Sequence, residues 1–532
     1  MNKIPNEGSQ ISSDNARRFL EEKILVEGKR KQPGIAFPSA AKQEYALIIR
    51  FNIKPLVRDV SFVRNGLRNL CTFLEEIDNG IVRIDEMVEH GDIARPKLSV
   101  FNFTSTLGFG VGFFDKLQIR SGNRPNNIYE MPDYEFFGDP VPYILPQTDM
   151  ILQLCSTKDF VNRWVFKNDF NPLMLNDKIR RTANREYGII SESASIQDVT
   201  TALRDWALIT DVHSGFQRLD GRNLMGFNDG LSQPNRLKND IIWTTKNDEV
   251  DKLTDGTYLV FQKIEHDLER WEKLSDKEQE RYVGRSKKTG LFIGTLSHSE
   301  DEKLAFDCRS DDLHTRNVAK SKLKKLLDLQ RDPQKGLFDS KDPRLMNISL
   351  ECPIWSHVRK ANPRGADGAE RSIIFRRGYL FMEDTIIPGD RASSGLLFVC
   401  FQRDVKHGFE HIKKHFLNNR NFPVPEKRKK FTRQELAYRR SRGRFSEEEL
   451  TKLDASARQS LGLDGLSYTQ TREESRDVDA ENTGREGLSG PSQLGVNPRG
   501  DYPLTITLGG GYYFVPPIPK KRISDLGQQF FE

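Results

Sequence analysis

The chain has 532 residues, of which 36% are hydrophobic and 30% are charged, and its 82 basic and 76 acidic residues give a formal net charge of +6. That length is sufficient for two domains with their own cores, and a charge balance so even for the size gives no indication of nucleic-acid binding. The high charged fraction favours solvated insertions around an ordinary globular core.

The five cysteines are odd in number, widely spaced and without a CxxC pair. This pattern argues against a disulfide framework and against structural zinc, and favours reduced thiols in a reducing compartment. The first residues contain neither an apolar signal-peptide core nor a twin-arginine start, and no apolar run approaches the length of a membrane span. We therefore expect a soluble, cytoplasmic protein with no membrane contact, although export by an unusual route stays open.

Residues 1–42 are polar and contain one short amphipathic pattern, in which Phe19, Leu20, Ile24 and Leu25 recur at helical spacing. We expect an arm that packs on the body of the protein or on a partner chain. This arm leaves a homodimer open.

Residues 43–235 form the first predicted domain. Apolar patterning predicts strands over Tyr45–Ile53, Leu98–Leu107, Met150–Leu154 and Ala207–Val212, and helices over Leu56–Ile77 and Ile196–Trp206. The resulting order, βαββαβ, is the ferredoxin-like arrangement. Residues 118–147 are rich in Pro, Asn, Gly and acidic residues, which predicts a long loop at the rim of a pocket.

Residues 253–422, completed by residues 501–518, form the second predicted domain. Strands are expected over Gly256–Ile264, Ser372–Phe375 and Gly395–Gln402, and helices over Glu265–Tyr282, within the charged residues 300–345 and over Phe409–Phe416. Residues 423–500 begin with a basic block and continue with an acidic, Gly/Ser-rich stretch, so we expect a disordered charged insertion. The predicted class is α+β, with two ferredoxin-like halves and antiparallel sheets.

A single histidine, His357, lies in the segment Cys352–Arg364 after the apolar pair Ile354 and Trp355. Neutral imidazole is a common protein ligand of haem iron, an apolar wall suits a porphyrin face, and basic side chains suit its propionates. The basic neighbours here are Arg359, Lys360 and Arg364. The segment alone equally fits a core or surface histidine.

A second segment, Leu224–Pro234, contains the pattern GxxDG from Gly226 to Gly230. Asn-Asp-Gly is favourable β-turn chemistry, because Asn228 and Gly230 tolerate a positive φ. The functional alternative is that the two glycines hold the Asp229 carboxylate close to the backbone, where it moves a proton between the oxygens of a peroxide.

Together, GxxDG, the pattern HxRxxNPR from His357, the triplet that begins at Arg376 and the apolar strand Gly395–Gln402 resemble the dye-decolourising peroxidase family. The glycine-rich segment Thr106–Gly110, the basic turn Gly284–Gly290 and the closing strand Gly509–Pro517 follow in the family's order. The resemblance runs from about residue 45 to residue 517, with one large interruption.

The resemblance implies one haem b per chain, bound in the second half. It makes His357 the proximal iron ligand, and it places Asp229 and Arg376 on the distal side. Leu396 and Phe398 share one strand face by period two, so they either wall the distal pocket or belong to the ordinary core. Three further assignments stay open: Arg359 and Arg364 contact propionates or cap a turn, and Glu410 accepts a hydrogen bond from the proximal imidazole or is a surface glutamate.

The implied activity is that of a haem peroxidase, which reduces hydrogen peroxide and oxidises dyes, phenols or other aromatic electron donors. An acidic optimum is expected, because a carboxylate base stays ionised in acid where an imidazole does not. The alternative is a haem-binding or haem-iron-handling protein with little peroxidase turnover, which would need His357 but neither Asp229 nor Arg376.

Overall fold

A computed structural model describes most of both predicted halves. The described residues are 31–36, 43–57, 59–80, 82–90, 93–100, 104–139, 141–156, 202–218, 220–228, 231, 241–331, 348, 351–353, 356–363, 372–383, 393–419, 504–519 and 522–532. The amphipathic pattern of the N-terminal arm, most of the helix expected over residues 196–206 and the insertion 423–500 lie outside them.

The strands of the first half form an antiparallel sheet in the order β4-β5-β1-β6. Their bounds are β1 (Tyr45–Ile53), β4 (Thr104–Phe109), β5 (Met150–Ser156) and β6 (Ala207–Phe216). Counted along the chain within this sheet, the second strand pairs with the third, the third with the first and the first with the fourth, which is the ferredoxin-like order. A separate hairpin, β2 (Val82–His90) with β3 (Ile93–Val100), interrupts this half.

The second half repeats the same order as β11-β7-β10-β9, again antiparallel. Its strands are β7 (Thr257–His266), β9 (Tyr379–Glu383), β10 (Ser393–Gln402) and β11 (Thr505–Val515), and the short β8 (Phe375–Arg376) pairs with the end of β10 beyond β9. The prediction of two ferredoxin-like halves with antiparallel sheets is confirmed.

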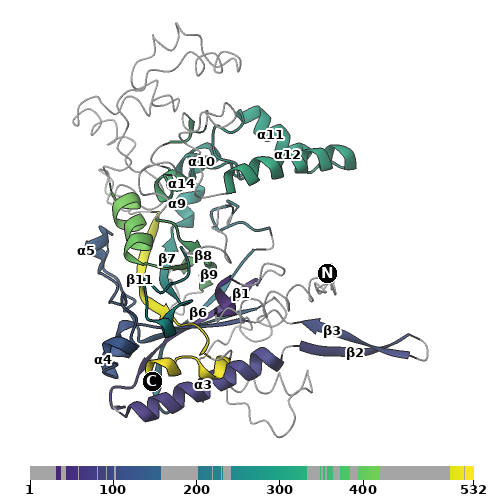
Figure 1. Cartoon of the computed structure of the whole chain (residues 1–532). Helices are drawn as coiled ribbons and strands as arrows, with labels where there is room; N and C mark the ends of the chain where they lie inside the picture. The colour runs from purple at the N-terminus through teal and green to yellow at the C-terminus, as the bar shows by residue number, and fades with distance from the viewer. Residues whose placement is uncertain are drawn as a thin grey trace, which may run out of the picture.

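The two sheets meet edge to edge and close into a ring of strands, drawn at the centre of Figure 1. Each seam is a single residue pair: Phe514 of β11 pairs with Phe109 of β4, and Phe216 of β6 pairs with Leu380 of β9. The inside of the ring holds a buried apolar cluster, whose members come from seven strands of both sheets, from α2 and from the segment around Trp243: Ile35, Ile48, Ile151, Ile242, Trp243, Leu259, Phe261, Phe375, Phe381, Leu397, Val399, Phe401, Tyr513 and Val515.

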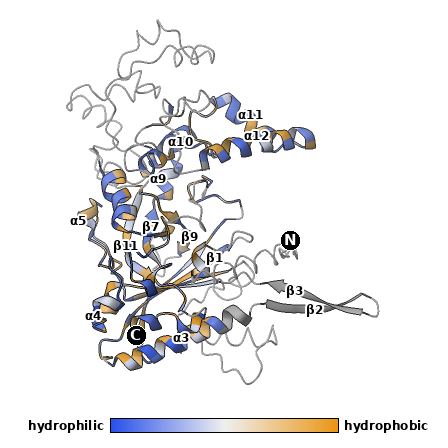
Figure 2. Cartoon of the chain, in the orientation of Figure 1, coloured by the Kyte–Doolittle hydropathy of each residue, from blue (hydrophilic) through white to orange (hydrophobic). Residues whose placement is uncertain are grey.

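Helix α3 (Val60–Gly80) covers the outer face of the first sheet, and Val63, Leu67, Leu70 and Leu74 are fully buried there at helical spacing. Figure 2 shows the alternation of hydrophobic and hydrophilic residues along this helix. The first half also contains four short helical segments: α2 (Pro33–Ala36), α4 (Val111–Lys116), η1 (Ser121–Asn123) and α5 (Tyr134–Phe137). The last two lie in residues 118–147, so the predicted loop contains short helical turns.

The second half carries its helices between β7 and β8 and between β10 and β11. The first group is α9 (Leu268–Glu272), α10 (Asp276–Val283), α11 (His298–Asp307), α12 (Leu313–Arg331) and α14 (His357–Ala361), preceded by η2 (Asp251–Leu253). The second is η4 (Lys406–Leu417), which winds as a π-helix with bonds such as Glu410 N to Val405 O at 3.0 Å. No helix in the described part of the chain is long and apolar enough to cross a bilayer.

The last residues return to the first half. After β11 the chain forms η7 (Ile523–Asp525) and η8 (Gln528–Phe530) against α3. Phe530 is fully buried, with its ring 5.0 Å from those of Phe109 and Phe114. Gln528 Oε1 accepts a hydrogen bond from Arg64 Nε of α3 at 2.9 Å. The C-terminal segment therefore completes the core of the half in which the chain begins.

Three expected elements differ in their limits. The helix expected over Glu265–Tyr282 is two helices, because Ser275 caps α10 through a reciprocal bond pair with Glu278. The strand expected over Leu98–Leu107 is divided between β3 and β4, and the one expected over Ser372–Phe375 begins only at Phe375.

Candidate functional site

His357 is the first residue of the short helix α14 and is half-buried. The turn before it is held by Cys352, whose Sγ lies 3.4 Å from Ser356 Oγ, and by Arg359, whose Nη1 donates to Cys352 O at 2.6 Å. Lys360 is buried and donates to Asn419 O at 3.2 Å. Of the two alternatives for Arg359, this bond supports a role in closing the turn. Arg364 lies outside the described residues.

The GxxDG segment begins with a tight turn. Phe227 N donates to Asn223 Oδ1 at 3.0 Å, Asn223 N donates to Phe227 O at 2.8 Å, and Gly226 has a φ of +89°. Only glycine adopts such a φ without strain, which explains its place in the pattern. Asp229 itself lies outside the described residues, but its neighbours Asn228 and Leu231 do not.

The turn Gly284–Gly290 touches both segments, and its two glycines mark the contacts. A Cβ on Gly284 would lie 2.5 Å from Ser356 Oγ and 2.6 Å from a methyl of Val358, the two residues that flank His357. A Cβ on Gly290 would lie 2.8 Å from Leu231 and 3.0 Å from Asn228 Nδ2. The structure therefore brings the surroundings of His357 and of Asp229 to the two ends of one seven-residue turn.

Apolar packing also holds the start of the GxxDG segment beside α14. Met225 and Phe227 are buried in one apolar cluster with Trp271 and Tyr282, and Val358 packs against that cluster. Trp271 Nε1 donates to Met225 O at 3.1 Å. Helices α9 and α10 thus hold the GxxDG segment beside the start of α14.

Polar contacts hold the turn itself in one conformation. The buried Arg285 donates to Gly290 O at 2.7 Å, and its guanidinium lies 4.0 Å from the centre of the Phe292 ring. Ser286 Oγ donates to Asp301 Oδ2 at 2.6 Å, and Lys287 N donates to Glu280 Oε1 at 2.8 Å. Burial raises the pKa of the Glu280 carboxyl above its ordinary value, although the bond from Lys287 opposes this.

Arg376, Leu396 and Phe398 lie on the outer face of the second sheet. All three are half-buried, whereas Leu397 and Val399 between them point into the ring and are fully buried. Arg376 stands opposite Cys400 in the register of β8 and β10. Burial raises the pKa of the Cys400 thiol, and the positive charge of Arg376 opposes that shift. The shared face expected for Leu396 and Phe398 is confirmed by their register, while their role is still a prediction.

Helix η4 lies over this sheet face and also contacts α14. Phe409 places its ring 5.9 Å from that of Phe398. Glu410 is buried and accepts a hydrogen bond from Tyr512 Oη at 3.2 Å, so it is not a surface glutamate. Long π-helical segments are rare and often occur at functional sites.

The decisive comparison is with protein families. Residues 220–435 match the family model described as "Dyp-type peroxidase, C-terminal", and this range contains Asp229, His357, Arg376, Leu396 and Phe398. About two-fifths of the chain, residues 220–435, therefore resembles the C-terminal part of Dyp-type peroxidases.

Curated relatives of this chain are named Deferrochelatase. That of Shigella flexneri serotype 5b (strain 8401) is 28% identical over 322 residues, and that of Escherichia coli (strain K12) is 27% identical over 322 residues. Each match covers 59% of this chain and 60% of the relative, so the chain matches three-fifths of the length of these relatives.

Two solved structures of Dyp-type proteins share the fold. The Anabaena sp. DyP-type peroxidase aligns with a TM-score of 0.53 and 17% identity over 98% of both chains. An oxyferrous/water mixed complex of DtpA from Streptomyces lividans aligns with a TM-score of 0.50 and 18% identity, covering 94% of this chain and 96% of that one.

Sequence reasoning missed the connecting role of the turn Gly284–Gly290. It noted the turn only as part of the resemblance. The signal was present, because a positive φ is costly for other residues and two glycines bracket a basic run. Gly284 and Gly290 have φ of +89° and +76°.

Proposed function

We propose that the chain is a haem-dependent peroxidase that reduces hydrogen peroxide and oxidises dyes, phenols or other aromatic donors. The observation that carries this proposal is the turn Gly284–Gly290, which packs at one end against the residues that flank His357 and at the other against Asn228 and Leu231, the described neighbours of Asp229. A proximal ligand and a distal base that act on one cofactor must come from neighbouring segments. One haem b per chain, bound in the second half, is part of the proposal.

The side chains present fit such a cofactor. Leu396 and Phe398 offer half-buried apolar groups on one sheet face, and Arg376 adds a cation beside them. His357 offers an imidazole nitrogen, a donor that iron accepts, from the half-buried start of helix α14, which packs against η4. When bound, the haem would supply an iron that takes up peroxide and its oxidising equivalents.

His357 would hold the iron through one ring nitrogen. The other ring nitrogen needs an acceptor that fixes the tautomer and the ring orientation. Glu410 is the candidate for this acceptor, because it is buried in η4 and η4 contacts α14.

On the opposite side, the ionised Asp229 would accept the proton from the near oxygen of the peroxide at a carboxylate oxygen. It would return that proton to the far oxygen, which then leaves as water. The guanidinium of Arg376 would stabilise the negative charge that develops as the O–O bond breaks, and would favour the ionised form of Asp229. Because a carboxylate stays ionised in acid, peroxidase activity should fall from acid to neutral pH.

The first test uses the visible spectrum. His357→Ala should lose the Soret band after reconstitution with haem, whereas His298→Ala, which removes an exposed imidazole from α11, should keep it. If His357→Ala retained the same Soret band and the same haem stoichiometry, the proximal assignment would be wrong.

The second test measures dye oxidation at equal haem loading. Asp229→Asn and Arg376→Leu should each lower kcat about 10²- to 10⁴-fold while haem binding is kept. Arg218→Leu is the matched control, because Arg218 is an exposed arginine that pairs with Asp220 in its own turn. Activity that survives both substitutions, or that rises steadily from acid to neutral pH, would contradict the proposed roles.

A second candidate is a haem-iron-handling protein with little peroxidase turnover, which the Deferrochelatase relatives favour. Such a protein would release iron from haem and leave the porphyrin intact, which porphyrin fluorescence detects. It would keep that activity in Asp229→Asn and Arg376→Leu while losing it in His357→Ala.

A further inference from the structure

Helices α11 and α12 form a hairpin that projects from the body of the second half (Figure 1). Its base is fixed, because Gln330 near the end of α12 accepts a hydrogen bond from Phe292 N at 3.0 Å and donates one to Thr295 Oγ1 at 2.7 Å. The inner faces of the two helices pack through Leu304, Ala319, Leu323, Leu326 and Leu327.

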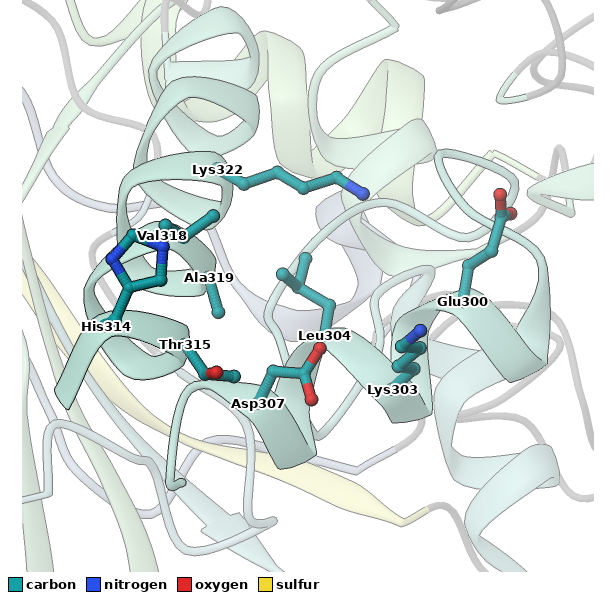
Figure 3. Close-up of a pocket in the computed structure, with 9 residues that line it drawn as sticks. All are labelled: Glu300, Lys303, Leu304, Asp307, His314, Thr315, Val318, Ala319 and Lys322. Atoms are coloured by element: carbon teal, nitrogen blue, oxygen red, sulfur yellow. The ribbon is translucent and has the colours of Figure 1, made fainter. Parts of the chain in front are cut away.

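An open groove of about 480 Å³ runs between the two helices (Figure 3). Each helix lines it with residues at i, i+3, i+4 and i+7: Glu300, Lys303, Leu304 and Asp307 from α11, and Thr315, Val318, Ala319 and Lys322 from α12, with His314 beside them. This spacing is the one by which a helix presents a single face to another helix. The groove therefore has the shape and the residue spacing of a site against which further helices pack.

Large apolar side chains that are exposed on the hairpin also indicate that a partner covers this surface. Val318 in the groove is 56% exposed, and Phe306 and Leu313 near the tip are 76% and 60% exposed. Single exposed apolar residues are ordinary, but three large ones on one hairpin are typical of an interaction surface.

The charges of the hairpin are divided between its helices. Helix α11 has four acidic residues and one lysine, whereas α12 has six basic residues and one aspartate. Two of the α11 acids already bind the body, since Asp301 accepts from Ser286 and Glu302 pairs with Lys288. Glu300 and Asp307 remain on the groove face, opposite Lys322 and His314.

A surface with one acidic and one basic helix is complementary to itself. A two-fold axis parallel to the helices would place each α11 on the α12 of the other copy, so that every acid–base contact occurs twice. We propose that the α11–α12 hairpin is a homodimer interface, in which two hairpins pack groove to groove as a four-helix bundle. The occupant of the groove is thus a second copy of this chain, and Glu300 of each copy lies near Lys322 of the other.

The first experiment measures the molar mass of the full chain by light scattering over a concentration series. The wild type should dimerise, and Val318→Asp should weaken the dimer at least tenfold by placing a charge in the groove. Leu208→Asp is the matched control, because Leu208 on β6 is 58% exposed, like Val318, and lies outside the hairpin. A wild type that stays monomeric up to about 100 µM, a concentration at which even weak specific dimers form, would overturn the proposal, as would a dimer insensitive to Val318→Asp.

The second experiment exchanges the charges. Glu300→Lys and Lys322→Glu each place like charges at two symmetric contacts, so each homodimer should weaken about tenfold. Mixing the two variants restores an opposite-charge pair at both contacts, and native mass spectrometry should find the heterodimer in excess. Glu300→Gln controls for the helix cap, because it removes the charge but keeps a side chain that serves the cap of Ser297. Equal amounts of homo- and heterodimer in the mixture would refute the proposed pairing.

Discussion

Asp211→Asn should destabilise the closed ring far more than an ordinary loss of one ion pair. Asp211 on β6 binds the guanidinium of Arg50 on β1, with Oδ1 2.7 Å from Nε and Oδ2 2.5 Å from Nη2. The Arg50 side chain is fully buried, and it also donates to the carbonyls of Pro146 at 2.8 Å and Gly510 at 3.4 Å and lies 5.2 Å from the centre of the Phe261 ring. His213 Nε2 lies 3.0 Å from the same carboxylate.

The magnitude follows from what the substitution leaves behind. An arginine does not lose its proton inside a protein, so Asp211→Asn leaves a buried cation with one amide oxygen in place of a bidentate carboxylate. Breaking a buried pair in this way costs about 3–5 kcal/mol. Because the two carbonyls and the amide oxygen still accept bonds from Arg50, we expect about 3 kcal/mol.

The free energy of unfolding that is lost in Asp211→Asn should depend on pH. Burial opposes ionisation of Asp211, but the hydrogen bonds from His213 and Arg50 outweigh it, so its pKa lies below the ordinary value. A depressed pKa gives stability that is present above the unfolded-state pKa of about 3.9 and is lost as pH falls through the folded-state pKa. The difference between wild type and variant should therefore be full at neutral pH and should close in acid.

Urea denaturation at neutral and acidic pH provides the measurement. The control is Asp220→Asn, because Asp220 also binds an arginine in bidentate fashion, with Arg218 at 3.0 and 2.7 Å, but on the surface. Both side chains of that pair are more than two-fifths exposed, so its loss should cost less than about 1 kcal/mol. Equal losses in the two variants, or a difference that persists in strong acid, would refute the reasoning.

Two further predictions concern stability. Gly66→Ala on α3 places a Cβ 2.3 Å from the ring of Trp206, so it should lower the unfolding free energy by about 1–3 kcal/mol in a thermal melt. The control is Gly122→Ala, whose Cβ meets nothing within 4 Å and which should leave the unfolding free energy unchanged. An unchanged melting temperature for Gly66→Ala would show that Trp206 moves aside freely. Burial lowers the pKa of His266 to about 4, and its Nδ1 has no hydrogen-bond partner among the described residues. The free energy of unfolding should therefore fall as pH drops from about 6.5 to 4, and His266 should contribute at most about 3 kcal/mol to that fall. In His266→Phe, the urea midpoint should depend less on pH over the same range. An equally steep fall in the variant would show that His266 does not cause it.

Elements with a strong apolar pattern were predictable from the sequence. The limits of Tyr45–Ile53 agree with those of β1, and the strands expected near β7 and β10 differ by one to two residues. The pairing of β2 and β3 as a hairpin was not expected, because four of the nine residues of β2 are charged and Pro96 lies inside β3, where proline argues against a strand. The break between α9 and α10 was available in the pattern from Ser275 to Glu278, which is a capping box.

The candidate site was predictable only as separate segments. The sequence indicated which residues carry chemistry, since His357, Asp229 and Arg376 stand in patterns that resemble one family. It did not indicate that Gly284–Gly290 lies between two of them, because local patterns carry no information about contacts between distant parts of the chain. Among the described residues, the neighbours of Asp229 and of His357 are brought together by α9, α10 and this turn.

The C-terminal segment has a consequence for synthesis on the ribosome. The rings of Phe109 and Phe114 emerge early, but Phe530, which fills the space between them, emerges after the whole second half. During translation the first half therefore lacks part of its own interior, and its exposed aromatic surface is the kind that chaperones bind. Contacts between residues so far apart also slow the search for the native state, so biogenesis should be limited by the arrival of these last residues rather than by either sheet.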